Sequence, residues 1–276
     1  MVEIGHKLVL SGCGARFPVH AGAYNAIYKH SLSPITGVAC SSGGAIIGGL
    51  IAMGYSPSSI LSLLKSMNLP EFMDYCWPKG FGLVYPNHSL IMGKKIDATL
   101  NKIFSMKFKD VKIPLHIFTT DFYDKIPVVF SQDTTPNETL ATAIRASISI
   151  PLLMPPVKYR SMHLVDGGIM NNFPIDFFGS GEDVIGIKIV QSESKVPIPT
   201  IPQQSNPVDI VMGTIDALIA SQEKEHYDDA MYARIIYAET THGAFDFNIT
   251  NQAVDLMYRD GQEAVRTHFN EKKEGQ

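Results

Sequence analysis

Apolar, β-branched runs alternate along the chain with stretches of helical spacing. Residues 6–12, HKLVLSG, have the consecutive apolar residues LVL of a buried strand, and residues 20–30 have the period of a helix. A second strand over 35–40 and an apolar helix over 44–53 repeat the pattern. The alternation predicts an α/β fold, with a central, mostly parallel (mixed) sheet flanked by helices.

The rest of the chain continues this pattern. Further strands are predicted over 114–121, 126–132, 157–160, 163–168 and 183–190, and further helices over 56–67, 91–104 and 138–147. The proline-rich stretch 195–207 is predicted to be an exposed loop. No internal repeat divides the chain, so we expect one domain over residues 6–270 and a disordered tail over 271–276.

Composition narrows the class of protein. The hydrophobic content of 45% and the charged content of 18% indicate a well-buried core. A net charge of −4 provides no basic field, so we expect no nucleic-acid partner. The three cysteines form no CxxC pair, and no group of acidic residues and histidines has the spacing of metal ligands. We therefore expect neither a disulfide framework nor a metal or other cofactor.

Targeting segments are not evident. The N-terminus lacks the basic and apolar regions of a secretory signal, and the apolar tract near residue 50 is too short to span a bilayer. We expect a cytoplasmic protein without a transmembrane segment, which could contact lipid only from the surface. The sequence does not indicate an oligomeric state.

Two adjacent serines lie between the second strand and its helix, in the sequence ACSSGG. A GxSxG turn exposes a nucleophilic serine and needs small residues two positions before and after it. With Ser41 at the centre, those positions hold Ala39 and Gly43; with Ser42 at the centre, the bulkier Cys40 occupies the first. We therefore predict Ser41 as the nucleophile. A small-residue turn into a core helix explains this short pattern equally well.

A glycine turn, SGCGARF, follows the first strand and precedes a helix. It could bind a dinucleotide, but Phe17 replaces the third glycine of that fingerprint and no acidic residue ends the second strand. The same geometry can form an oxyanion hole from the amides of Cys13, Gly14 and Ala15. Arg16 would then lie near the developing negative charge. We favour the oxyanion hole over the nucleotide site.

A third segment, HLVDGGIMNNFP, places Asp166 at a strand end before a tight turn formed by Gly167 and Gly168. Together with the two earlier turns, TTD, AIRASISIPLLMPP and the late FDFNITNQAVDLMYRDGQEAV, it resembles the patatin-like phospholipases over roughly residues 6–266. The DGGxxNNxP and AIRASxxIP segments are the specific ones. The resemblance implies the three-layer patatin-like fold.

The resemblance also implies a catalytic Ser–Asp dyad, with Ser41 as nucleophile and Asp166 as general base, without a histidine or a metal. Burial can raise the pKa of such a carboxyl toward its working range. The implied oxyanion loop is Gly12, Cys13, Gly14, Ala15 and Arg16, and the implied supporting residues are Ala39, Ser42, Gly43, Gly167 and Gly168. We expect hydrolysis of fatty-acyl esters of phospholipids or lysophospholipids at a membrane or micelle surface.

Three residues depart from the family pattern. Cys13 replaces the middle glycine of the loop, Phe17 the glycine after the arginine, and Ala39 the first glycine of the serine turn. Loss of one oxyanion donor lowers a rate by about 10²–10³-fold. The alternative is therefore a non-catalytic lipid-binding or scaffold protein that retains the fold, although the intact serine and aspartate favour an enzyme.

Four other features are given structural explanations. We expect His242 to be a structural or surface residue, His20 to have a packing or loop-orienting role, and Arg145 to brace a buried turn without a catalytic role. The aromatic segment from Phe72 to Tyr85 is interpreted either as a flap over an acyl-chain cleft or as ordinary packing.

Overall fold

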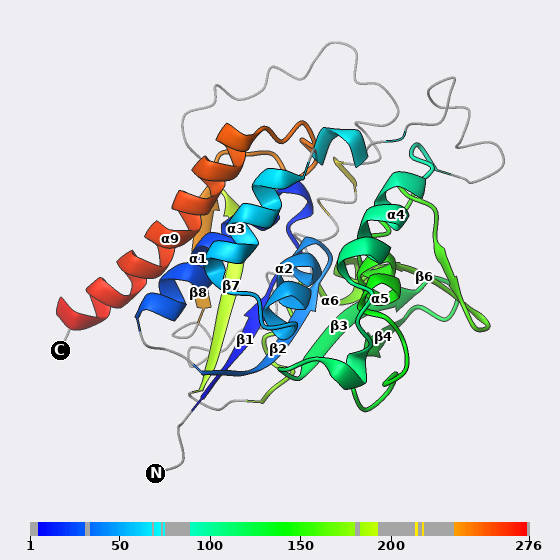
Figure 1. Ribbon diagram of the computed structural model, residues 1–276, viewed down its shortest axis with the longest axis horizontal. Helices are drawn as coiled ribbons and strands as arrows, with labels where there is room; N and C mark the ends of the chain where they lie inside the picture. Colours follow the sequence, from blue (N-terminus) through cyan, green and yellow to red (C-terminus); the bar gives the residue numbers. More distant parts are fainter. Residues whose placement is uncertain are drawn as a thin grey trace.

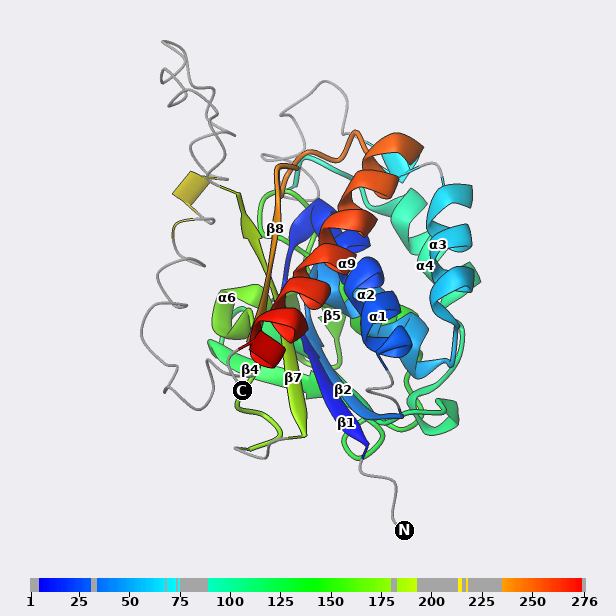
Figure 2. The same ribbon diagram turned by 90° about the vertical axis from the view of Figure 1, so that its left-hand side faces the viewer.

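The protein is built around a mixed sheet of eight strands, with most of the helices packed on one face (Figures 1 and 2). This computed structural model describes residues 5–30, 34–67, 69–72, 74, 89–179, 183–192, 213–214, 217 and 235–274. The predicted loop at 195–207 and the aromatic positions at 75–85 lie outside the described residues.

The strands confirm the predicted α/β class. They are β1 (His6–Leu10), β2 (Ile35–Ser41), β3 (Leu115–Asp121), β4 (Ile126–Phe130), β5 (Val157–Tyr159), β6 (Met162–Asp166), β7 (Val184–Gln191) and β8 (Ile235–Thr240). Their order is β5-β6-β3-β2-β1-β7-β8, with β4 also paired to β3. The run from β3 to β8 is parallel, whereas β4, β5 and β6 pair in antiparallel fashion.

The helices over 17–29, 43–52, 57–66, 94–103 and 140–147 lie close to their predicted positions, whereas those over 168–171 and 251–274 were not predicted. They are α1 (Phe17–Lys29), α2 (Gly43–Ala52), α3 (Pro57–Ser66), α4 (Lys94–Ile103), α5 (Leu140–Ser147), α6 (Gly168–Asn171) and α9 (Asn251–Glu274). Figure 2 shows α1, α2, α3, α4 and α9 on one side of the sheet and α6 on the other. Because α9 continues to Glu274, residues 271–274 are helical where we predicted a tail.

Alternate side chains of the central strands enter two cores. In β1, Leu8 and Leu10 belong to the main core under the helices, while Val9 points to the other face. This explains why the strands read as continuous apolar runs. The smaller core contains Val9, Ala39, Phe118, Phe173, Ile175, Val184 and Ile235.

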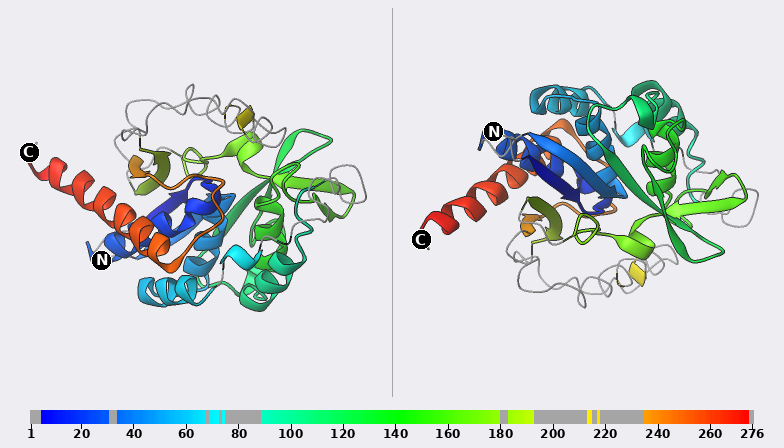
Figure 3. Two further views of the ribbon diagram at one scale, coloured as in Figure 1. Left: turned by 90° about the horizontal axis from the view of Figure 1, so that it is seen from above. Right: turned by 90° about the horizontal axis from the view of Figure 1, so that it is seen from below.

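Helix α9 lies against α1, and its C-terminal turns extend beyond the sheet (Figures 1 and 3). The two helices approach closely because each presents a glycine at the crossing. A Cβ at Gly22 would overlap the carbonyl oxygen of Tyr258, and one at Gly261 would overlap that of Val19. This contact holds α1, which follows directly after the glycine loop, against α9.

The ends of β2 and β6 meet along one edge of β3. β2 pairs with β3 as far as Phe118, and β6 pairs with it from Thr119 onward. β4 pairs with both residues, so it occupies the opposite edge and leaves β2 and β6 to share the other. The last residues of these two strands, Ser41 and Asp166, are therefore the partners of neighbouring residues in β3.

Candidate active site

Ser42 forms the turn between β2 and α2. Its backbone has φ 48° and ψ −129°, a conformation that strains any residue other than glycine by about 1–3 kcal/mol. The Oγ of Ser42 donates a hydrogen bond of 2.6 Å to Oδ2 of Asp166. The strained turn therefore presents this hydroxyl, and not that of its neighbour, to the carboxylate.

The structure corrects our expectation that Ser41 contacts Asp166. Ser41 is the last residue of β2 and is fully buried, and its Oγ has no hydrogen-bond partner within the described residues. Because side chains alternate along a strand, Ser41 points to the same face as Ala39, toward the smaller core. Its Oγ lies only 2.6 Å from where a Cβ of Gly167 would be.

Cys40 is tolerated two positions before Ser42 because α2 makes room for it. A Cβ at Gly48, in the second turn of α2, would lie 2.7 Å from the Sγ of Cys40. The thiol also donates to the carbonyl of His116 at 3.5 Å. We favoured Ser41 because the residue two positions before it is small. In the structure, Gly48 of α2 provides the space instead, and the bulkier Cys40 fits two positions before Ser42.

The start of α2 is pressed against the glycine loop. A Cβ at Gly43 would lie 2.5 Å from the carbonyl oxygen of Gly14, and one at Gly44 would lie 2.5 Å from that of Ser11. Both positions therefore require glycine. The close approach places the first amides of α2 beside the loop that we predicted to hold an oxyanion.

Within the glycine loop, three amides already have partners. The amides of Gly12, Ala15 and Arg16 donate to the carbonyls of Asn172, Ala244 and Cys13 at 2.8, 2.8 and 3.1 Å. The structure therefore corrects the expected contribution of the Ala15 amide to an oxyanion hole. For the amides of Cys13 and Gly14, the described part of the chain supplies no acceptor.

Side chains around the loop support its shape. His20 is buried, and its Nε2 donates to the carbonyl of Ser11 at 2.9 Å, the orienting contact that we predicted. Nε of Arg16 donates to the carbonyl of Cys13 at 3.2 Å, so the guanidinium braces the loop. Burial raises the pKa of the Cys13 thiol to about 12, which keeps this thiol neutral.

Asp166 is buried at the end of β6 and hydrogen-bonded through both carboxylate oxygens. Oδ2 accepts from Ser42, and Oδ1 accepts from the amide of Gly168 at 2.7 Å. Burial raises the pKa of Asp166 to about 7, although both hydrogen bonds act to lower it. A carboxyl group with this pKa can gain and lose a proton near neutral pH, as a general base must.

Ser147, which we did not identify from the sequence, contacts the serine turn directly. Its Oγ accepts a hydrogen bond from the amide of Ser42 at 2.8 Å and donates one to the carbonyl of Phe118 at 2.6 Å. The only available signal was the family-specific AIRAS segment in which Ser147 lies.

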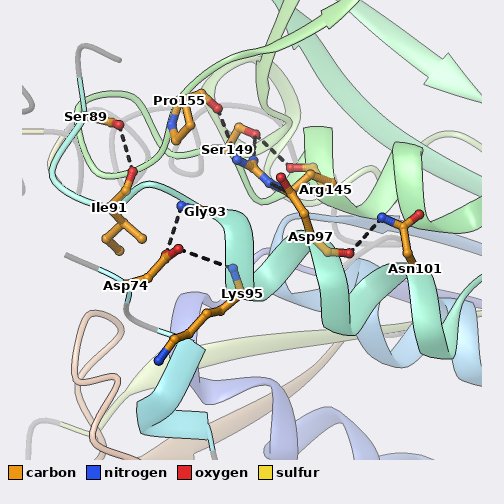
Figure 4. Close-up of polar contacts among 10 residues, drawn as sticks. All are labelled: Asp74, Ser89, Ile91, Gly93, Lys95, Asp97, Asn101, Arg145, Ser149 and Pro155. Atoms are coloured by element: carbon orange, nitrogen blue, oxygen red, sulfur yellow. Dashed lines mark hydrogen bonds and ion pairs between the residues drawn. The ribbon is translucent and has the colours of Figure 1, made fainter. Parts of the chain in front are cut away.

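Arg145 braces the end of α5, as predicted. It extends from α5 to Asp97 on α4, with Nε 2.6 Å from the carboxylate, and its Nη1 donates to Oγ of Ser149 at 2.5 Å (Figure 4). Asp74 holds the start of α4 by accepting from the amides of Gly93 and Lys95 at 2.9 and 3.2 Å. The two acidic residues thus fix α4 at its N-terminal end.

An apolar cavity of about 90 Å³ opens from Ser42 and is lined by residues of α1, α2 and α4 and of the segments that follow α3, α5 and β8. Ser42 and Thr99 are the only described lining residues with a side-chain hydroxyl, and Ser41 is not part of the lining. The apolar lining residues are Phe17, Ile46, Met67, Leu69, Phe72, Ile96, Leu100, Phe104, Ile148, Ile150, Met154, Phe247 and Ile249. The described lining is therefore almost entirely apolar, and Ser42 carries one of its two hydroxyl groups.

Other titratable residues lie apart from this arrangement. Nε2 of His242 is 2.9 Å from the carbonyl oxygen of Asp246, in the loop after β8. Among the described residues, no three His, Cys, Asp or Glu side chains are grouped as metal ligands would be. None of the described helices combines the length and apolar composition needed to cross a bilayer.

Comparison of the sequence with known proteins gives a consistent family. A model described as patatin-like phospholipase matches residues 8–178. Lysophospholipase NTE1 of Scheffersomyces stipitis is 27% identical over 194 residues, which cover 69% of this chain and 12% of that protein. Probable lipid hydrolase 463L of Invertebrate iridescent virus 6 is 29% identical over 179 residues, 61% of each chain.

Two further comparisons extend over most of the chain. The uncharacterized protein YqhO of Bacillus subtilis is 25% identical over 268 residues, covering 88% of this chain and 91% of that one. The crystal structure of VipD from Legionella pneumophila superposes with a TM-score of 0.60 and 16% identity over 96% of this chain and 67% of VipD. This structural likeness shows a shared fold.

Proposed function

Since the chain belongs to the patatin-like phospholipase family, we propose that it hydrolyses a fatty-acyl ester bond of a phospholipid or lysophospholipid, with Ser42 as nucleophile and Asp166 as general base. The observation that carries this proposal is the 2.6 Å hydrogen bond from Ser42 to Asp166 at the mouth of an apolar cavity. The lipid-hydrolase names of two relatives support the same reaction class.

The proposed reaction proceeds through an acyl-enzyme. Asp166 takes the proton of the Ser42 hydroxyl while Oγ attacks the acyl carbonyl carbon, and the amides of Cys13 and Gly14 donate to the resulting oxyanion. Collapse of this intermediate expels the alcohol, which receives the proton from Asp166. Asp166 then deprotonates a water molecule that attacks the acyl-enzyme, and the fatty acid leaves as Ser42 recovers its proton.

The proposal includes peripheral contact with the membrane or micelle that supplies the lipid. Phe122, Tyr123 and Ile126, at the turn between β3 and β4, are 52%, 68% and 50% exposed. This turn follows the end of β3 that pairs with β6, the strand ending in Asp166. Exposed apolar side chains in such a group mark interaction surfaces.

The experiment is covalent labelling with a fluorophosphonate probe, with the modified residue located by peptide mass spectrometry. We expect the wild type to be labelled on Ser42 and to release fatty acid from a panel of phospholipids and lysophospholipids. Ser42→Ala should lose both properties, whereas Ser41→Ala, the matched control, should keep the label.

Other outcomes distinguish the alternatives. Labelling of Ser41 would show that the serine at the end of β2, and not the one in the turn, is activated. A folded wild type that binds fatty acid in the cavity but reacts with no probe would instead support the non-catalytic lipid-binding protein.

A further inference from the structure

Ser147 is fully buried at the C-terminal end of α5, and its hydroxyl makes two hydrogen bonds of fixed direction. The carbonyl of Phe118 can only accept, so the hydroxyl proton of Ser147 points to it, at an O–O distance of 2.6 Å. A lone pair of the same oxygen is left to accept the amide of Ser42 at 2.8 Å. Ser147 therefore links the serine turn to the middle of β3.

The backbone around Ser147 holds the other half of the dyad. The carbonyl of Ser147 accepts from the amide of Gly167 at 3.3 Å, and that of Ser149 accepts from the amide of Asp166 at 2.9 Å. The end of α5 thus contacts both the turn that carries the nucleophile and the turn that carries the base.

The end of α5 is also held by its own hydrogen bonds and by an ion pair to α4. Oγ of Ser149 donates to the carbonyl of Arg145 at 2.7 Å and accepts from the Arg145 guanidinium, which is paired with Asp97 (Figure 4). Figure 4 shows this guanidinium between α4 and Ser149. Ser147 is therefore held on a supported element and can act as a fixed reference point for the turn.

We propose that Ser147 is a positioning residue, whose hydroxyl holds the backbone of Ser42 in its left-handed conformation and keeps Oγ within reach of Asp166. This inference rests on the proposed function. Ser42 follows the last residue of β2 and precedes the first residue of α2, and its amide donates its hydrogen bond to Ser147. This bond is made while Ser42 has a backbone conformation that non-glycine residues avoid. Without that bond the turn relaxes, and a displacement of about 1 Å at a reacting atom costs on the order of 10²-fold in rate.

The test compares four variants by kcat, KM, the rate of fluorophosphonate labelling and Tm. Ser147→Ala removes the hydroxyl. Ser147→Thr and Ser147→Val introduce side chains of nearly the same shape, of which only threonine has a hydroxyl. Ser89→Ala is the matched control, because Ser89 is also fully buried and donates to a carbonyl, that of Ile91 at 2.8 Å, away from the dyad.

We expect Ser147→Ala and Ser147→Val to lower kcat and the labelling rate by roughly 10–100-fold with little change in KM. Ser147→Thr should be at least several-fold faster than Ser147→Val, and Ser89→Ala should lower Tm without lowering kcat. Labelling of Ser147→Ala at the wild-type rate would overturn the inference, as would equal rates for the Thr and Val variants if the Ala variant does not fold. A wild type that neither hydrolyses lipid nor is labelled on Ser42 would instead overturn the proposed function itself.

Discussion

Asp166 is subject to opposing influences that make both stability and activity depend on pH. Burial raises the pKa of its carboxyl from the ordinary 3.8 to about 7 in the folded protein. The folded state therefore binds this proton more tightly than the unfolded state, and stability falls as pH rises from 3.8 through about 7. The carboxylate form that the proposed mechanism needs is thus the form that the fold stabilises less well.

Asp166→Asn should separate these two effects. We expect kcat to fall by about 10²–10⁴-fold, since the general base is lost. The Tm of the variant minus that of the wild type should be larger at pH 8 than at pH 5, because the amide does not titrate. Differential scanning calorimetry of both proteins provides the measurement.

The same comparison contains its own control for other titrations. Burial lowers the pKa of His20 from 6.5 to about 4, so His20 also makes Tm depend on pH, but this contribution is the same in both proteins and cancels in the difference. In the wild type, kcat/KM should increase with pH around a midpoint near 7, the pKa of Asp166. A Tm difference that is the same at pH 5 and pH 8 would contradict the assignment of the buried charge to Asp166.

The sequence could predict Asp166 but not which serine faces it. An aspartate at a strand end before two glycines allows one placement of the base. The serine turn allows two, because the two glycines after Ser42 satisfy either register. What decides between them is tertiary: β2 continues through Ser41 to pair with Phe118, and Gly48 accommodates the thiol of Cys40.

At the scale of elements, the close contact between α2 and the glycine loop is the feature most sensitive to substitution. We expect Gly44→Ala to destabilise the protein by about 1–3 kcal/mol, because backbone carbonyls of β1 and the loop must move. Labelling of Ser42 should slow in parallel, since the turn is attached to α2. Urea unfolding and the fluorophosphonate reaction measure the two effects.

Gly37→Ala is the matched control for this prediction. Gly37 lies on β2, which leads into the same turn, and a Cβ there would lie 3.4 Å from the ring of Phe178, an ordinary contact. The same added methyl group should therefore leave stability and labelling nearly unchanged. Equal destabilisation by the two substitutions would show that the α2 contact is not the cause.

Element prediction succeeded where the apolar pattern is strong and failed at edges and caps. Strands β1 to β7 and helices α1 to α5 were found from their periods, with ends shifted by a few residues, but the long helix α9 was not predicted. Helix α4 begins at Lys94 and not near residue 91, because Gly93 has φ 78° and Asp74 caps the helix from a distant segment. Strand β8 was missed, since exposed Tyr237 and Glu239 interrupt its apolar run at the edge of the sheet.

At the scale of the whole molecule, the apolar cavity beside Ser42 would, on the proposed function, determine which acyl chains can be accommodated. Ile46 on α2 lines this cavity close to Ser42. Ile46→Trp should fill part of the space and lower kcat/KM for long-chain esters by roughly tenfold or more, while short-chain esters react nearly as before. Esters of increasing chain length, assayed with one leaving group, provide the measurement.

The control is Leu256→Trp on α9, where the side chain is 51% exposed and outside the cavity lining. This substitution introduces the same indole without changing the acyl site, so the chain-length profile should match that of the wild type. A uniform loss for all esters in Ile46→Trp would point to a damaged serine turn and not to a shortened cavity.

The shared edge of β3 also has a consequence for when the protein can become active during its synthesis. Ser42 and Asp166 are 124 residues apart in the chain, yet they meet because β2 and β6 occupy successive parts of one strand edge. A nascent chain that has emerged only as far as β4 already contains the serine and the glycine loop but lacks the base. The Ser42–Asp166 pair therefore forms only after the hairpin of β5 and β6 has folded onto β3, so on the proposed function a shorter nascent chain is inactive.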